Sequence, residues 1–190
     1  MNVLEHLEPK SVFRFFEEMC AIPHGSRNTK AVSDWCADFA RARGLEYHQD
    51  GDNNIIIIKE AAPGYEAAPP VILQGHLDMV CEQTADCQKD MSREGLDLAV
   101  DGDFVYAKGT TLGGDDGIAV AMALALLDAE GLPHPRLEAV FTVDEEIGLL
   151  GAASIDVTPL KGRQMLNLDS EAEGIFTVSC PGGNTSACLL

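Results

Sequence analysis

The sequence has little positive charge. Its 190 residues include 13 Lys and Arg against 31 Asp and Glu, which gives a formal net charge of −18, and the sequence pI is near 4.4. Nucleic acids and anionic membranes bind proteins through basic faces, so we expect neither as a partner. The surplus of carboxylates is compatible instead with hard or borderline metal cations.

Three further features are missing. The six cysteines form no C-x-x-C pair and are too scattered for a small disulfide scaffold. The N-terminus, MNVLEHLEPKSVF, has no basic region followed by an apolar core, which a secretory leader would require. The longest apolar run, 117–127, has 11 residues, whereas a membrane span needs roughly 18. Together these absences predict a protein of the reducing cytoplasm.

Hydrophobic residues make up 46% of the chain, enough for a buried core. Apolar residues at helical spacing predict helices, and continuous apolar runs predict strands. In chain order we expect helices at about 9–20 and 28–43, strands near 45 and at 55–59 and 71–75, a hairpin at 96–108, a helix at 118–131, a strand at 137–143, a short helix at 148–153, and strands at 164–168 and 175–180. This alternation predicts an α/β fold with a mixed, mainly parallel sheet covered by helices on both faces.

The stretch VILQGHLDMV (71–80) places His76 and Asp78 two residues apart at the end of an expected strand. Residues i and i+2 of extended backbone point to the same side. A carboxylate beside an imidazole can orient the ring as a metal ligand. Taken alone, the stretch is explained more simply as a solvated polar loop.

Other acidic residues follow the same pattern. Asp144, Glu145 and Glu146 come directly after the strand LEAVFTV, and Asp169 follows QMLNL. Asp115 lies in the glycine-rich turn TLGGDDG before the apolar helix. In open α/β sheets, ligands bind outside the carboxyl ends of the strands. Like charges gathered there would repel one another unless a cation lay among them, so the pattern indicates a metal site.

Each of these acids also has a simpler explanation. Asp115 and Asp116 could cap the helix that follows them. Glu145 and Glu146 could cap the next short helix, and Asp169 could cap a turn. The competing motifs are weaker, because DGDNN lacks the glycine and the final glutamate of a calcium loop. There is also no H-E-x-x-H, G-x-S-x-G or phosphate-binding loop sequence.

The ordered series GHLDMV, TLGGDDG, TVDEEIG and NLDSE resembles the di-zinc metallopeptidases that include aminoacylases, carboxypeptidases and cytosolic dipeptidases. Within that family it is most similar to the bacterial aminoacyl-histidine (Xaa-His) dipeptidases. The resemblance implies two zinc ions, with manganese or cobalt as alternatives. It also implies the following roles: His76 and Asp169 as ligands of one metal, Asp115 as the bridging ligand, Glu146 as a ligand of the second metal, Asp78 as the residue that orients His76, Glu145 as the general base, and a cis Asp115–Asp116 bond.

The same resemblance gives expectations for the whole chain. Relatives carry a lid or dimerisation domain after the segment that matches SCPGG, and a late stretch that supplies the last histidine ligand. We therefore expect 1–182 to be the N-terminal part of a catalytic domain and 183–190 to begin the connection to the lid. A homodimer would form through that further domain.

The activity expected of the full-length protein is the hydrolysis of Xaa-His dipeptides, and the isolated 190-residue chain is expected to be inactive. Two alternatives remain open at this point. One is a catalytically inactive, metal-binding fragment, and the other is a related amidohydrolase that acts on N-acyl amino acids. The residues of the lid would set the choice of substrate.

Overall fold

The computed structural model describes residues 3–170 and 174–179. The expected boundary at 182/183 lies outside these residues. Within them the elements follow one another in this order: α1 (Lys10–Cys20), α2 (Lys30–Ala42), β1 (Glu46–Gln49), β2 (Ile55–Lys59), β3 (Val71–His76), β4 (Leu98–Asp101), β5 (Phe104–Ala107), α3 (Gly114–Asp128), β6 (Leu137–Thr142), α4 (Leu150–Ser154) and β7 (Gln164–Asn167).

The main sheet has the strand order β1-β2-β6-β3-β7, and β4 and β5 form a separate hairpin. β3 runs parallel to both of its neighbours, β6 and β7. β2 runs antiparallel to β1 and to β6. The expectation of an α/β fold with a mixed sheet is confirmed. The parallel half of the sheet is the half whose strands lead to the polar residues identified above.

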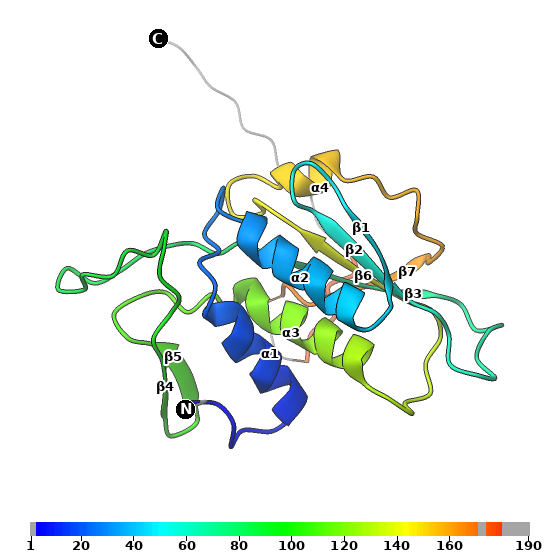
Figure 1. The fold of residues 1–190 in the computed structure, drawn as a ribbon, viewed down its shortest axis with the longest axis horizontal. Coiled ribbons are helices and arrows are strands. Elements are labelled where there is room, and N and C mark those ends of the chain that lie inside the picture. Colours follow the sequence, from blue (N-terminus) through cyan, green and yellow to red (C-terminus); the bar gives the residue numbers. More distant parts are fainter. Residues whose placement is uncertain (1–2, 171–173, 180–190) are drawn as a thin grey trace, which may run out of the picture.

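One face of the sheet carries most of the helical mass, with α1, α2 and α3 grouped together (Figure 1). α3 packs against both α1 and β3, which explains why its sequence is apolar all round. The ring of Phe15 on α1 makes edge-on contacts with Trp35 and Phe39 of α2, at centroid distances of 6.5 and 5.4 Å. These aromatic pairs join the two amphipathic helices that begin the chain.

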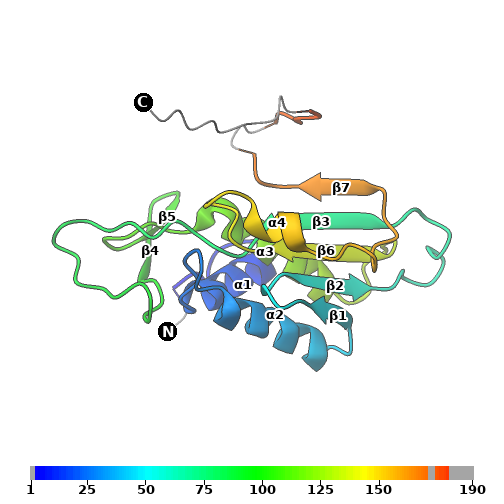
Figure 2. The ribbon, with the colours of Figure 1, turned by 90° about the horizontal axis from the view of Figure 1, so that it is seen from above.

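The opposite face has a smaller apolar cluster, formed by Ile56, Ile58, Ile72 and Val140, with Ile155 and Leu160 packed against it. Ile155 directly follows α4 (Leu150–Ser154), and Leu160 lies between α4 and β7, so the connection between these two elements covers this cluster. β7 lies at the edge of the sheet (Figure 2), and its four residues are all exposed. The expected strand at 175–180 is not formed in its described part, 175–179, where Phe176 and Val178 are exposed.

A buried carboxylate holds the connection that enters β7. Glu138, the second residue of β6, accepts a hydrogen bond from Arg136 Nε at 2.7 Å. It also accepts the backbone N–H groups of Lys161 and Gly162, both at 2.9 Å. A charge in the interior persists only when it is paired and hydrogen-bonded. Glu138 meets both conditions, and its hydrogen bonds hold in place the segment that leads into β7.

Candidate metal centre

The ends of three parallel strands deliver the predicted side chains to one edge of the sheet. His76 is the last residue of β3, and it lies in register with Thr142, the last residue of β6. Glu145 and Glu146 follow β6, and Asp169 follows β7. Because parallel strands share one direction, these residues meet at the carboxyl edge of the sheet.

Asp115 reaches the same edge from the start of α3. The Asp115–Asp116 peptide bond is cis, and neither residue has helical backbone angles. Asp115 Oδ1 lies 3.1 Å from His76 Nε2, and its side chain is 66% exposed. Asp116 is buried and directed differently, because its Oδ2 accepts the backbone N–H of His76 at 3.3 Å. Neighbouring acids thus have different environments, one at the site and one beneath it.

The ligand atoms around His76 form two overlapping groups, in each of which all the atoms lie within 4.8 Å of one another. One group contains His76, Asp115 and Glu146, and the other contains His76, Glu145 and Asp169. In the described part of the chain, the ion pairs of these side chains involve no Lys or Arg. One imidazole and several carboxylates form a donor set that suits zinc, manganese or cobalt.

Asp78 contacts the site through two different groups. Its backbone carbonyl lies 2.9 Å from His76 Nδ1, closer than its carboxylate Oδ1, which lies 3.5 Å away. The carboxylate accepts the backbone N–H of Glu145 at 3.0 Å and that of Glu146 at 3.4 Å. The main chain of Asp78 therefore makes the shorter contact with the imidazole, and its carboxylate holds the acidic segment after β6.

The electrostatics of the cluster are those of crowded acids. Burial opposes the charged form of His76, but the hydrogen bond with Asp78 and the charges of Asp116 and Asp78 outweigh it and raise the pKa of His76 to about 10. Burial raises the pKa of Asp116 to about 7. Burial and the charge of Asp115 raise the pKa of Asp169 to about 6. A ligating histidine must be neutral, so a metal cation would compete with the imidazole proton for the same place.

The turn between α1 and α2 also reaches this site, which the sequence did not indicate. Ser26 Oγ donates a hydrogen bond to Asp78 Oδ2 at 2.7 Å. The backbone N–H of Arg27 donates to Asp144 Oδ1 at 2.6 Å. Both residues lie in IPHGSR, whose composition predicts only a turn. No periodicity or spacing links this turn to Asp78 and Asp144, from which Ser26 and Arg27 are separated by 52 and 117 positions of the chain.

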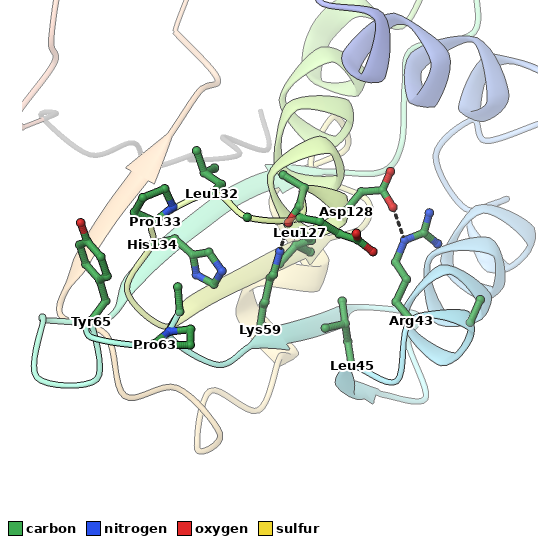
Figure 3. Close-up of a pocket in the computed structure, with 15 residues that line it drawn as sticks. Arg43, Leu45, Lys59, Pro63, Tyr65, Leu127, Asp128, Leu132, Pro133 and His134 are labelled. Carbon is green, nitrogen blue, oxygen red and sulfur yellow. Dashed lines mark hydrogen bonds and ion pairs between the residues drawn. The ribbon is translucent and has the colours of Figure 1, made fainter.

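The two ends of the sheet each have a hollow, and the two hollows differ in size and in the residues that line them. At the carboxyl edge, a hollow of about 190 Å³ is lined by Asp115, Asp116 and Asp169, among others. At the opposite end, a hollow of about 650 Å³ lies between α2, α3 and the segment before β6 (Figure 3). There Arg43 pairs with Asp128 (Figure 3). The potential metal-ligand groups in the described residues lie at the carboxyl edge and not in this second hollow.

Residues 72–183 match the model of the peptidase family M20/M25/M40, and the chain belongs to this family. No helix among the described residues has the length and apolar character that a membrane span requires.

The chain is similar to several peptidases in sequence or in fold. The chain is 37% identical over 183 residues to the cytosol non-specific dipeptidase of Escherichia coli, covering 96% of this chain and 38% of that protein. The crystal structure of aminoacylhistidine dipeptidase from Vibrio alginolyticus matches with a TM-score of 0.87 and 38% identity, covering 90% of this chain and 35% of that one. A tripeptidase from Staphylococcus aureus shares the fold, with a TM-score of 0.71 and 22% identity over 86% of this chain and 44% of that one. The chain thus spans between a third and a half of the length of these relatives.

Proposed function

We propose that this chain takes part in metal-dependent hydrolysis of dipeptides, of the Xaa-His type, with two zinc ions as cofactor. One observation carries the proposal: His76 and four carboxylates meet at the sheet edge in two overlapping groups of potential ligands. Four acids around one imidazole are excess negative charge that divalent cations would neutralise. The site belongs to a chain of a peptidase family, so hydrolysis of a peptide bond is the chemistry it would serve.

The donor set fits the proposed metal. In our assignment, which follows the family resemblance, one ion would be held by His76, Asp115 and Asp169, and a second by Asp115 and Glu146. The distances group these side chains differently, with Glu146 beside His76 and Asp115, and Asp169 beside His76 and Glu145. Three protein ligands are typical of a catalytic zinc site. When bound, such ions lower the pKa of a coordinated water and polarise the carbonyl of the scissile bond. Manganese and cobalt accept the same donors and are the alternatives.

The chain's own residues would then move the proton. Glu145 takes the proton from the attacking water and passes it to the leaving amine, as a general base and then a general acid. Its backbone N–H is held by Asp78 Oδ1 at 3.0 Å, and its carboxylate Oε2 lies 3.9 Å from His76 Nε2. Asp78 and Glu145 are therefore the proposed catalytic pair, with Asp78 fixing the position of Glu145.

The remaining proposals concern the whole protein. Two of the relatives are named as a cytosol non-specific dipeptidase and an aminoacylhistidine dipeptidase, which supports dipeptides as the substrate class and the cytoplasm as the location. We propose that 1–182 belongs to the catalytic domain and that any homodimer forms through residues beyond this chain. We propose neither nucleic acid nor membrane as a partner, because the net charge is −18.

A substrate screen with a matched variant tests this function. The zinc-loaded protein is offered Xaa-His dipeptides, other dipeptides and N-acyl amino acids, both as the 190-residue chain and within a longer polypeptide that contains it. Release of free amino acids is followed by chromatography. Hydrolysis of Xaa-His dipeptides that is lost in Glu145→Gln supports the proposal. Preference for N-acyl amino acids would replace it with an amidohydrolase, and zinc binding without hydrolysis in either form would indicate a metal-binding fragment.

A further inference from the structure

We propose that Ser26, in the turn between α1 and α2, is a positioning residue that aligns the Asp78 carboxylate and, through it, the Glu145–Glu146 segment. The inference rests on the proposed function only in the roles given to Glu145 and Glu146. The hydrogen bonds that carry it belong to the fold and exist whatever the substrate is.

The Asp78 carboxylate has a separate set of donors for each oxygen. Oδ1 accepts the N–H of Glu145 at 3.0 Å. Oδ2 accepts the hydroxyl of Ser26 at 2.7 Å and the N–H of Glu146 at the longer distance of 3.4 Å. Rotation of a carboxylate about its last side-chain bond is soft, so a short hydrogen bond to each oxygen is needed to fix its plane. Ser26 supplies the short bond on the Glu146 side.

Asp78 is also too buried for water to replace Ser26 easily. The residue is 1% exposed, and a buried carboxylate that loses a donor reorients toward those that remain. The remaining short bond is the one to Glu145. Without Ser26, the carboxylate would turn toward Glu145 and lengthen its contact with Glu146, the proposed ligand of the second metal.

The backbone around Ser26 is itself fixed to the two strand ends that form the site. Ser26 N–H donates to the carbonyl of Met79 at 3.3 Å, and Met79 N–H donates to the carbonyl of His24 at 3.2 Å. Arg27 N–H donates to Asp144 at 2.6 Å. The hydroxyl of Ser26 is therefore presented from a backbone that contacts the segments following both β3 and β6.

A glycine precedes Ser26 where this turn lies against the chain after β3. Gly25 forms an isolated parallel bridge with Met79. A Cβ placed on Gly25 would lie 2.5 Å from Sγ of the exposed Cys81, so a larger residue would have to displace that side chain. Gly25 leaves the contact between the two segments undisturbed.

A simpler role for Ser26 would be to donate a hydrogen bond to the buried Asp78 carboxylate without fixing the orientation of that carboxylate. The two roles differ in what happens to the Glu145 and Glu146 amides. A satisfying role predicts that loss of the hydroxyl changes stability alone. A positioning role predicts that the amide protons of Glu145 and Glu146 sense the loss, because their acceptor turns.

The first test measures amide proton chemical shifts in the 190-residue chain, with no metal added. The variants are Ser26→Ala, Ser26→Thr and the control Ser33→Ala, which removes a different serine hydroxyl, a buried one that accepts a hydrogen bond from Gln49 at 2.8 Å. In Ser26→Ala the Glu146 amide proton should move upfield as its bond to Asp78 lengthens. Ser26→Thr should keep the wild-type shifts, and Ser33→Ala should leave both glutamate amides unchanged. Should Ser26→Ala fail to fold, Ser26→Cys, with a weaker donor of similar size, provides the same comparison.

The second test is calorimetric titration of zinc into the same variants. Ser26→Ala should weaken the site that includes Glu146 by about tenfold, the lower end of the effect of residues that support a ligand. Ser33→Ala should not change zinc affinity. Wild-type protein that binds no zinc would refute the proposed function and leave the chemical shifts to judge Ser26. Unchanged Glu145 and Glu146 amide shifts in Ser26→Ala, with or without a loss of stability, would overturn the positioning role.

Discussion

The two ends of the sheet use carboxylates in opposite ways. At the end near the larger hollow, Asp128 accepts hydrogen bonds from Arg43 Nε and from an Arg14 guanidinium nitrogen, both at 2.6 Å. At the carboxyl edge, Asp169 lies among other acids and shares its group of potential ligands with His76 and Glu145. The same residue type is neutralised by the protein in one place and left among like charges in the other.

The pKa values follow this difference. Burial opposes ionisation of Asp128, but its hydrogen bonds and charge interactions with Arg43 and Arg14 outweigh burial and lower its pKa. Burial and the charge of Asp115 raise the pKa of Asp169 to about 6. Carboxylates paired with arginine hold helices and loops together, whereas carboxylates without such partners are available to an external cation. The comparison thus separates structural acids from candidate ligands.

The largest effect is expected for Glu145→Gln in a catalytically active polypeptide that contains this chain. The amide cannot take a proton from water, so turnover should fall by about 10²–10⁴-fold, the usual contribution of a general base. Zinc content should stay near that of the wild type, because Glu145 is not one of the proposed ligands. Steady-state kinetics on the zinc-replete variant, with metal analysis, measure both. Wild-type turnover in this variant would refute the assignment of the base.

Zinc binding comes next in size. In our assignment one site keeps three ligands in this chain and the other keeps two, so we expect one zinc to bind more tightly than a second. Loss of a residue that supports a metal ligand weakens metal binding by roughly 10–100-fold. His76 is itself a proposed ligand, so His76→Ala should weaken zinc binding at the tighter site by at least this factor. Glu146→Ala should act mainly on the weaker site.

The exposed His48, which pairs with Glu46 at 2.9 Å, provides the matched control, since His48→Ala should leave both zinc affinities unchanged. Calorimetry on the 190-residue chain gives the constants. Two equally tight sites, or a tight site that persists in His76→Ala, would show that the division of ligands is wrong.

A structural carboxylate should affect stability instead of zinc binding. Glu138 is fully buried and pairs with Arg136. Glu138→Ala leaves the buried Arg136 with only its exposed partner Glu60 and removes the acceptor of the Lys161 and Gly162 N–H groups, so it should lower the free energy of unfolding by about 3–5 kcal/mol. Glu60 pairs with the same arginine from an exposed position, and Glu60→Ala should cost less than about 1 kcal/mol. Urea unfolding of the two variants provides the comparison. Equal losses would mean that burial does not distinguish the two glutamates.

The smallest effect concerns Asp128 and depends on pH. Its folded-state pKa is lowered, so its contribution to stability is present above the unfolded-state pKa of about 3.9 and is lost as pH falls through the folded-state value. At pH 7, Asp128→Asn should lower the free energy of unfolding by about 1 kcal/mol. The difference from wild type should shrink as the pH is brought below about 4. Urea unfolding at a series of pH values measures it, and a difference that grows in acid would contradict the cited direction.

Much of the fold was readable from local patterns. The runs IIIIK and LEAVFTV gave strands β2 and β6 at nearly the expected positions, because continuous apolar residues need cover on both faces of a sheet. The segment IFTVS is also rich in apolar and β-branched residues but forms no strand at 175–179. Its residues are exposed, and a strand depends on a neighbouring edge that sequence composition does not specify.

Only part of the candidate site could be predicted from such local sequence patterns. His76, Glu145 and Asp169 could be grouped because each follows an apolar strand, and parallel strands end at one edge of the sheet. Ser26 follows no strand, and its contact with Asp78 spans 52 positions of the chain. A turn's composition predicts its local shape but carries no information about what it packs against.

By itself, the sequence determined the acidic balance, the order of helices and strands, and the set of acids that follow strands, because these depend on composition and on periodicity within short windows. Tertiary structure alone decided that Asp116 turns away from the ligand groups while Asp115 joins them, and that the Asp78 carboxylate holds the Glu145–Glu146 segment. It also decided that Ser26 meets Asp78. These contacts depend on the direction of individual side chains and on segments brought together across the sheet, which the sequence specifies only through the folded chain as a whole.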